Sequence, residues 1–247
     1  MHRSKTNLLS LLNVIAVVCA FDLKFAIIDK KNLIGPVNTF SIVALDPESG
    51  AIGIAVASKY LGVGSAVPWA KATVGAVATQ SYVNTTIGTS ALGLMSQGKS
   101  AQETLEEVLQ GDKGKEWRQV GLVDRRGNSC AFTGKNCLPW AGSKQSKNIT
   151  VQGNLLTGPE VIDCMFNTFD KQSGELSIRL INALAAGEKA GGDKRGKQSA
   201  AILVVRANHG PNGLGDREID LRVDDHHNPI QELARLMRLK GIAVKID

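Results

Sequence analysis

Aromatic residues are scarce in this sequence. They make up only 4% of the 247 residues, whereas glycine occurs 26 times. Small side chains therefore dominate, and we expect closely packed layers joined by many turns. After residue 38 no basic segment is interleaved with aromatic residues. The net charge of +6 therefore does not indicate a protein that binds nucleic acid.

Several chemical motifs are missing as well. The four cysteines form no C-x-x-C pair, which excludes the usual cysteine zinc site. Cys130 and Cys137 either form a disulfide in an oxidising compartment or remain thiols, and the sequence leaves both open. No G-x-S-x-G elbow is present, which argues against an α/β-hydrolase. The basic, glycine-rich segment 191–199 lacks P-loop spacing.

The N-terminus carries the most apolar segment, but this run is too short to predict a membrane anchor. A basic start, an apolar run and small residues near Ala20 are typical of a secretory signal peptide over 1–20. That interpretation predicts a secreted or periplasmic protein. The alternative is an extension on a cytoplasmic protein. Residues 21–38 then form a linker or propeptide, and 39–247 a single domain.

Apolar patterning predicts a layered α/β protein. The clearest element is a hairpin of strands 39–45 and 51–57, joined by an Asp-Pro-Glu-Ser-Gly turn. Ser100 and Glu103 form a capping box that predicts a helix ending near Gly111. The further strands are predicted over 73–80, 120–123, 130–133, 150–153, 200–205 and 219–223, and the further helices over 88–97, 161–169, 176–186 and from 229 onward.

Thr39 opens the first strand and is the first candidate for chemistry. A threonine hydroxyl becomes a useful nucleophile when a base lies beside it, and a free α-amine on the same residue is such a base. That amine exists only if the chain is cut after Asn38. The alternative is an ordinary strand threonine.

Other candidates lie at the ends of the predicted strands. Lys71 is the cation expected to lower the pKa of the Thr39 amine, with Lys59 as a competing choice. Asn154 is the expected donor to an oxyanion. The remaining candidates are polar residues expected to bind substrate or orient the nucleophile: Ser58, Lys59, Thr79, Gln80, Ser81, Asp193, Arg195 and Gln198.

Carboxylates and imidazoles cluster near the C-terminus, at Asp224, Asp225 and His226. These residues are either ligands for a divalent metal or acidic residues at the start of the last helix, where they complement the helix dipole. We favour the second interpretation and expect no metal site.

Many segments in order resemble the family called domain of unknown function 1028. The match covers about 39–240 and rests on Thr39–Ala44, Ala55–Lys59, Val67–Lys71, Gly75–Gln80, Arg118–Gly121, Ala131–Gly134, Pro139–Gly142, Val151–Asn154, Gly191–Asp193, Gln198–Ser199 and Asp220–His226. The resemblance implies the fold of N-terminal-nucleophile (Ntn) hydrolases, a four-layer αββα sandwich of two antiparallel sheets. It also implies an amidohydrolase with Thr39 as mature N-terminus and no cofactor.

This sequence departs from relatives in which the threonine follows the initiator methionine, because 38 residues precede Thr39. Activity therefore requires a second cut, at the Asn38–Thr39 bond. The expected partner is a small-molecule or peptide amide, and self-association into a homo-oligomer is left open. Two alternatives remain, a secreted binding module without catalysis and a metal-dependent hydrolase using Asp224, Asp225 and His226.

Overall fold

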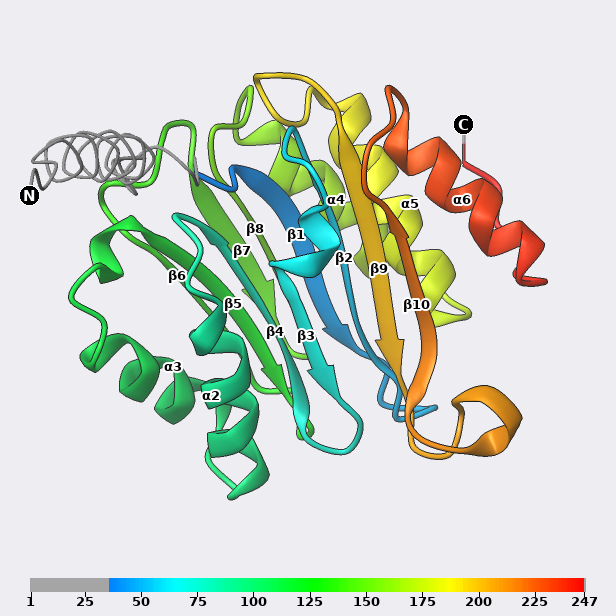
Figure 1. Cartoon of the computed structure of the whole chain (residues 1–247), viewed down its shortest axis with the longest axis horizontal. Helices are drawn as coiled ribbons and strands as arrows, with labels where there is room; N and C mark the ends of the chain where they lie inside the picture. Colours follow the sequence, from blue (N-terminus) through cyan, green and yellow to red (C-terminus); the bar gives the residue numbers. More distant parts are fainter. Residues whose placement is uncertain (1–35, 247) are drawn as a thin grey trace, which may run out of the picture. The chain divides into compact units, whose positions relative to one another are not determined.

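Two antiparallel sheets form the centre of the computed structural model, which describes residues 36–246 (Figure 1). The predicted signal peptide 1–20 and most of the predicted propeptide lie outside the described residues. The larger sheet has six strands in the order β10-β9-β2-β1-β8-β7. Its strands are β1 (Thr39–Leu45), β2 (Ile52–Ser58), β7 (Gly142–Ser146), β8 (Ile149–Gly153), β9 (Ser199–Val205) and β10 (Arg217–Val223).

The smaller sheet has four strands in the order β3-β4-β5-β6. They are β3 (Pro68–Lys71), β4 (Gly75–Ser81), β5 (Arg118–Asp124) and β6 (Ser129–Thr133). The five helices of the described part are α2 (Thr85–Ser96), α3 (Ala101–Gln110), α4 (Glu160–Lys171), α5 (Leu176–Lys189) and α6 (Pro229–Leu239).

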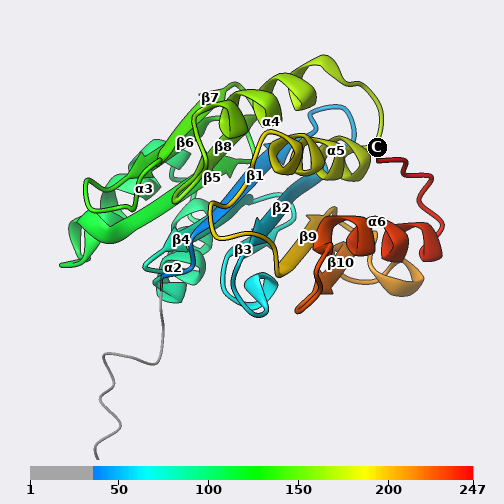
Figure 2. The ribbon, with the colours of Figure 1, turned by 90° about the horizontal axis from the view of Figure 1, so that it is seen from above.

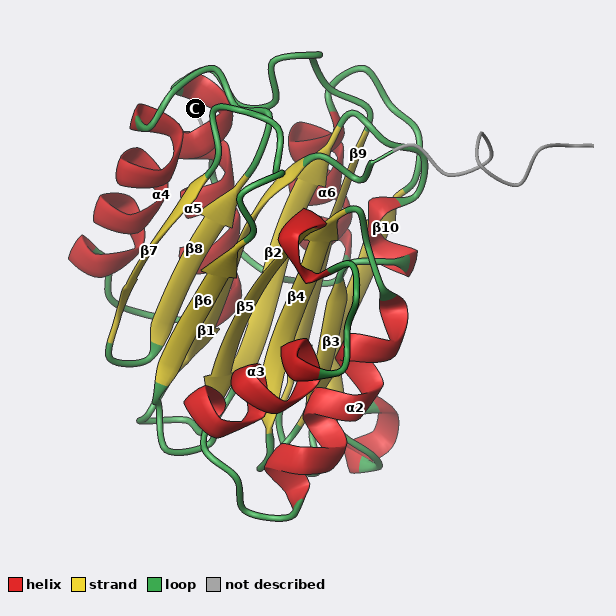
Figure 3. Ribbon diagram, turned by 90° about the vertical axis from the view of Figure 1, so that its left-hand side faces the viewer, coloured by secondary structure: helices red, strands yellow, loops and turns green. Residues whose placement is uncertain are grey.

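The two sheets lie face to face between two layers of helices (Figures 2 and 3). Helices α4, α5 and α6 pack on the outer face of the six-stranded sheet, and α2 and α3 pack on the four-stranded sheet. Three apolar clusters fill the three spaces between these layers. The expected order of helix, sheet, sheet, helix layers is therefore present.

Both faces of β1 carry apolar side chains, which explains why this strand lies in the middle of the sheet with both faces covered. Phe40, Ile42 and Ala44 belong to the cluster under α4 and α5, whereas Val43 and Leu45 belong to the cluster between the sheets. Successive side chains in a strand point to opposite faces, so Thr39 and Ser41 share the face that looks into the space between the sheets. Both faces are covered, and every residue of β1 and β2 is buried.

Local signals in the sequence agree with the observed ends of several elements. The β1–β2 hairpin turns at Gly50, whose φ of 72° lies in the left-handed region that glycine adopts freely, and its N–H donates to the carbonyl of Asp46. Ser100 and Glu103 form the predicted capping box of α3. Strands β3 and β7 were not predicted, since both are short and β7 is largely exposed. Within residues 36–246 no helix is long and apolar enough to cross a bilayer.

Candidate functional site

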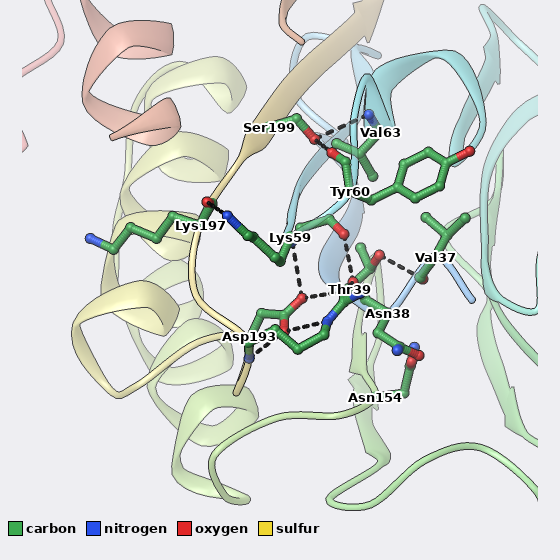
Figure 4. Close-up of polar contacts among 12 residues, drawn as sticks. Val37, Asn38, Thr39, Lys59, Tyr60, Val63, Asn154, Asp193, Lys197 and Ser199 are labelled. Carbon is green, nitrogen blue, oxygen red and sulfur yellow. Dashed lines mark hydrogen bonds and ion pairs between the residues drawn. The ribbon is translucent and has the colours of Figure 1, made fainter. Parts of the chain in front are cut away.

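Thr39 is the first residue of β1, at the centre of the six-stranded sheet. Its side chain is fully buried, and its Oγ1 donates to the carbonyl of Val37 at 2.7 Å. Its carbonyl accepts from the backbone N–H of Asn154 at 3.0 Å and from Nε2 of Gln80 at 3.3 Å. The residue is therefore held on both sides, by its own sheet and by the facing one. Figure 4 shows Thr39 beside Val37 and Asn38.

The peptide bond that precedes Thr39 has a polarised carbonyl. The oxygen of Asn38 accepts from Ser58 Oγ at 2.5 Å and from Nη2 of Arg195 at 2.9 Å. Ser58 faces Thr39 in the β1–β2 register, which explains why its hydroxyl reaches this oxygen. Two donors on one carbonyl, one of them charged, are the arrangement that stabilises a developing oxyanion.

Asp193 fixes Arg195 in this position. The Asp193 side chain is 1% exposed. Its carboxylate accepts from Arg195 Nη2 at 2.7 Å and Nε at 3.1 Å, and also from the backbone N–H of Lys59 at 3.0 Å. A bidentate ion pair of this kind orients the guanidinium as well as neutralising it. The ammonium of Lys59 points away and donates to the carbonyl of Lys197 (Figure 4).

A cluster of buried amides lies between the sheets directly below Thr39. Gln80 Nε2 donates to Gln119 Oε1 at 2.9 Å, and Gln80 Oε1 accepts from the Ser41 hydroxyl at 2.7 Å. Gln152 Nε2 donates to the Ser41 Oγ at 2.7 Å. Gly121 makes room for this cluster, because a Cβ there would lie 2.1 Å from Gln152 Oε1. We call Ser41, Gln80, Gln119 and Gln152 the amide cluster.

Asn154 does not contact the polarised carbonyl, contrary to expectation. Its Nδ2 donates to Gln119 Oε1 at 2.8 Å, and its backbone N–H is bonded to Thr39. Its backbone N–H and one of the two N–H groups of Nδ2 therefore already have partners. Its Oδ1 is buried and has no hydrogen-bond partner within the described residues. The donors to the Asn38 carbonyl come instead from Ser58 and Arg195.

Lys71 is not brought to Thr39. It pairs with Gly75 at the start of β4, whereas Ser81, at the other end of that strand, pairs with Val37. Six residues of extended strand separate these ends, or about 20 Å. The Lys71 side chain is also exposed. The prediction that it tunes the Thr39 amine was wrong, because the sequence does not reveal which end of β3 and β4 faces β1.

Two further candidates have other partners. The Thr79 hydroxyl donates to the carbonyl of Asn84, the residue that caps α2. Gln198 Nε2 donates to Asp225 Oδ1, and only its backbone N–H reaches the site strand, at the carbonyl of Ser58. Ser81, in contrast, lies at the site and bonds the segment that precedes Thr39.

The described residues contain no group of three or more His, Cys, Asp and Glu side chains arranged to hold a metal ion. His226 Nδ1 accepts from the backbone N–H of Asn228 at the start of α6, whereas Asp225 accepts from Gln198 and neither Asp224 nor Asp225 lies in the first turn of that helix. Cys130 and Cys137 are free thiols. Burial raises the pKa of Cys130 to about 12 and also raises the pKa of Cys137, so neither is a ready nucleophile.

Sequence reasoning missed Ser41, Gln119 and the role of the Asn38 carbonyl. A period-of-two pattern was available for Ser41, since Thr39 and Ser41 are the polar residues on one face of an otherwise apolar strand. Glutamine inside a buried strand was a second signal, present in β4, β5 and β8. Buried amides need partners, and these strands supply them to one another.

Comparison with known proteins places this geometry in a family. No curated protein matches the chain. Anbu (ancestral beta-subunit) from Yersinia bercovieri aligns at a TM-score of 0.35 and 11% identity, over 85% of this chain and 100% of that one, which is too low to support an argument. The crystal structure of protein SPO2555 from Silicibacter pomeroyi aligns at a TM-score of 0.76 and 33% identity, over 83% of this chain and 90% of that one.

The Silicibacter pomeroyi protein is itself described by the family model DUF1028. The same model, described as a family of unknown function, matches residues 39–233 of this chain. The match starts at Thr39, the residue at which β1 begins. The chain therefore belongs to the DUF1028 family.

Proposed function

We propose that this chain is an N-terminal-nucleophile amidohydrolase whose mature N-terminus is Thr39. The observation that carries the proposal is the double hydrogen bond on the Asn38 carbonyl, immediately before a buried threonine at the start of a central strand. The helix–sheet–sheet–helix arrangement supports it, because an Ntn-like sandwich presents its nucleophile at such a strand start. Residues 1–38 must be removed for the mechanism to operate.

The first step is a cut of the chain by its own threonine. Thr39 Oγ attacks the carbonyl carbon of Asn38, and Ser58 Oγ and the Arg195 guanidinium stabilise the oxyanion. The C–N bond breaks, and the Thr39 nitrogen takes the hydroxyl proton, which leaves an ester between Asn38 and Thr39. Water hydrolyses this ester to the Asn38 carboxylate and restores the threonine hydroxyl.

The mature site repeats this chemistry on a substrate amide. The free Thr39 amine takes the proton from Oγ as it attacks, and returns it to the departing amine. An acyl ester forms on Oγ and is hydrolysed by water. Asn154 Oδ1, a buried acceptor without a partner in the described residues, is available to orient the new amine. The reaction uses residues of this chain and water alone.

The proposal is tested by the intact mass and N-terminal sequence of the purified full-length chain. We expect a product that begins at Thr39 in the wild-type chain and an uncut product from Thr39→Ala. Hydrolysis of a panel of amides by the cut form would establish the activity. A wild-type chain that keeps residues 21–38, or a Thr39→Ala chain that is cut equally well, would contradict it.

A catalytically inactive binding module on the same fold is the second candidate. It is favoured by the burial of Val37 and Asn38, which are 0% and 1% exposed in the uncut chain. Ligand binding without turnover, by a chain that keeps residues 21–38, would support it. Export by a signal peptide over 1–20 accompanies either candidate as a proposal, and the transit of the full chain through a secretory membrane would test it.

A further inference from the structure

Val37 and Asn38, the two residues before Thr39, are buried and follow a path along the end of β4 that we call the channel. Val37 forms an antiparallel bridge with Ser81, in which Val37 N–H donates to the Ser81 carbonyl at 2.7 Å and Ser81 N–H donates to the Val37 carbonyl at 3.0 Å. The Val37 side chain joins the apolar cluster between the sheets. Removal of residues 1–38 would empty this channel and leave both backbone groups of Ser81 without partners.

We propose that the emptied channel binds the acyl side of an extended peptide, with the Ser81 backbone as its anchor. This inference rests on the proposed function, since the channel is freed only by the cut before Thr39. The occupant takes the path that Val37 and Asn38 follow in the uncut chain. The substrate class is therefore a peptide amide rather than a small isolated carboxamide.

The spacing of the hydrogen-bonding groups of Ser58, Arg195 and Ser81 matches the spacing of amides in a peptide. Ser58 and Arg195 define where a scissile carbonyl lies, and Ser81 bonds the N–H and C=O of the residue just before it. Only a chain with amides at peptide spacing satisfies all of these groups together. Backbone pairing of this kind is how extended peptides add to an unpaired edge of a sheet.

The backbone at the channel is held in an unusual conformation. Ser81, which pairs with Val37, has a φ of 68°. Non-glycine residues rarely adopt this left-handed region, and they persist there where the surroundings fix them, frequently at ligand-binding sites. At Ser81 this conformation ends β4 and allows the bridge with Val37.

An exposed aromatic pair begins at the residue after Ser81. Tyr82 follows Ser81 and is 37% exposed, and its ring packs edge to face on Trp117, which is 43% exposed, with centroids 5.1 Å apart. Where a bound peptide continues the antiparallel direction of the Ser81–Val37 bridge, the residue before its valine lies beside Tyr82. The pair therefore offers an apolar contact to the third residue of a bound peptide, counted back from the scissile bond.

The test uses peptides rather than variants of the buried site. The protein is produced from the full-length chain, and its mass is first used to show that the purified product begins at Thr39. It is then given acetyl-Gly-Pro-Val-Asn linked to aminomethylcoumarin, together with the same peptide carrying an N-methyl group on valine, which removes the donor to the Ser81 carbonyl. A peptide with sarcosine in place of glycine carries the same added methyl at its far end and is the matched control.

We expect hydrolysis of the parent and sarcosine peptides and a loss of about tenfold or more in kcat/KM for the N-methylvaline peptide. Calorimetric titration with the corresponding free acids measures binding without turnover, and we expect the same order. If the cut enzyme hydrolyses simple amides but treats all three peptides alike, the channel is overturned while the proposed function stands.

The remaining outcomes separate the two proposals. If the cut chain hydrolyses no amide but binds the free acids in the expected order, the channel is supported and the hydrolase is not. If the chain keeps residues 1–38, both the hydrolase and the channel proposals are contradicted. In that case the backbone of Val37 stays bonded to Ser81, and no substrate can take its place.

Discussion

The space between the two sheets differs at its two ends. Toward the middle and far end of β1 it is filled by aliphatic side chains such as Val43, Ile54 and Val123. Beneath Thr39 the same space holds the amide cluster, whose members are fully buried and bonded to one another. One pair of sheets thus encloses an apolar end and a polar end.

This difference indicates that the apolar end stabilises the fold and that the polar end positions the residues around Thr39. Burial of aliphatic groups is favourable by about 25 cal/mol per Å², so the apolar end holds the sheets together. Buried amides only regain in the fold the hydrogen bonds that they had with water. Their benefit is geometric, since Gln80 bonds the carbonyl of Thr39 and links it to Gln119 and Ser41.

Among substitutions at the polar end, Thr39→Ala is expected to have the largest effect on activity. We expect a loss of chain cutting and of amide turnover by more than about 10³-fold, because the nucleophile is removed. Thr39→Ser keeps a hydroxyl and is the matched control, with substantial cutting retained. The readout is the mass of the purified chain over time. Equal cutting by the alanine variant would show that the polar end does not hold the nucleophile.

Ser58→Ala removes one donor from the Asn38 carbonyl. We expect cutting to slow by about 10²- to 10³-fold, the usual effect of losing one oxyanion donor. Ser96→Ala is the control, because the Ser96 hydroxyl bonds the Leu92 carbonyl on α2, far from the site. Rates are followed by mass after a pulse of synthesis. If both variants cut at the wild-type rate, Ser58 has no part in the reaction.

At the apolar end, Ile54→Ala should cost about 2–5 kcal/mol of unfolding free energy, and Ile54→Val about 0.5–1.5 kcal/mol. Ile54 lies four residues before Ser58 in β2 and is fully buried. We therefore expect cutting by the folded fraction to stay at the wild-type rate. Denaturant titration measures the stability. A variant that folds stably but cuts slowly would mean that the two ends are not separable.

For Gln80→Leu, at the polar end, we expect the opposite result to Ile54→Ala, with a larger effect on cutting than on stability. The change leaves the Ser41 hydroxyl and Gln119 Oε1 short of a partner, which costs about 1–3 kcal/mol, and it removes a contact to the Thr39 carbonyl. We expect cutting to slow more than stability alone explains, as measured by mass and denaturant titration on one preparation. A large loss of stability with normal cutting would assign the amide cluster to the fold instead.

The smallest effect is expected at the rim of the polar end, where Arg118 bonds Asp112 at 2.7 Å and also the carbonyl of Tyr82. The Arg118 hydrogen bond lowers the pKa of Asp112. The pair therefore stabilises the fold above the unfolded pKa of about 4 and loses this contribution as pH falls through the folded pKa. The melting temperature of Asp112→Asn should lie below that of wild type at pH 7, with a gap that narrows below about pH 4.

Asp163→Asn is the control for this measurement, because Asp163 pairs with Lys144 on the open surface, where both side chains are about half exposed. Surface pairs of this kind contribute little. We expect no comparable pH-dependent gap for it. An equal gap in both variants would assign the acid response to general charge rather than to the Asp112–Arg118 pair.

Much of the fold could be predicted because its signals are local. The β1–β2 hairpin, the capping box of α3 and the helix over α5 each depend on residues close together in the chain. Strands β3 and β7 escaped prediction because they are short and carry no strong alternation. Their existence depends on the neighbouring strands that they pair with.

The sequence by itself determined where β1 begins, with Thr39 as its first residue, and predicted a paired strand over 51–57, one residue short of the observed end at Ser58. Only the tertiary structure decided what meets there. Arg195 reaches the Asn38 carbonyl from 157 residues away, Gln80 arrives from the facing sheet, and Lys71 is excluded at the opposite end of its strand. The alternation of apolar residues that predicts a strand depends on neighbours along the chain. The contacts at Thr39 depend instead on how the two sheets stack and on which ends of their strands align, and no local sequence pattern encodes this alignment.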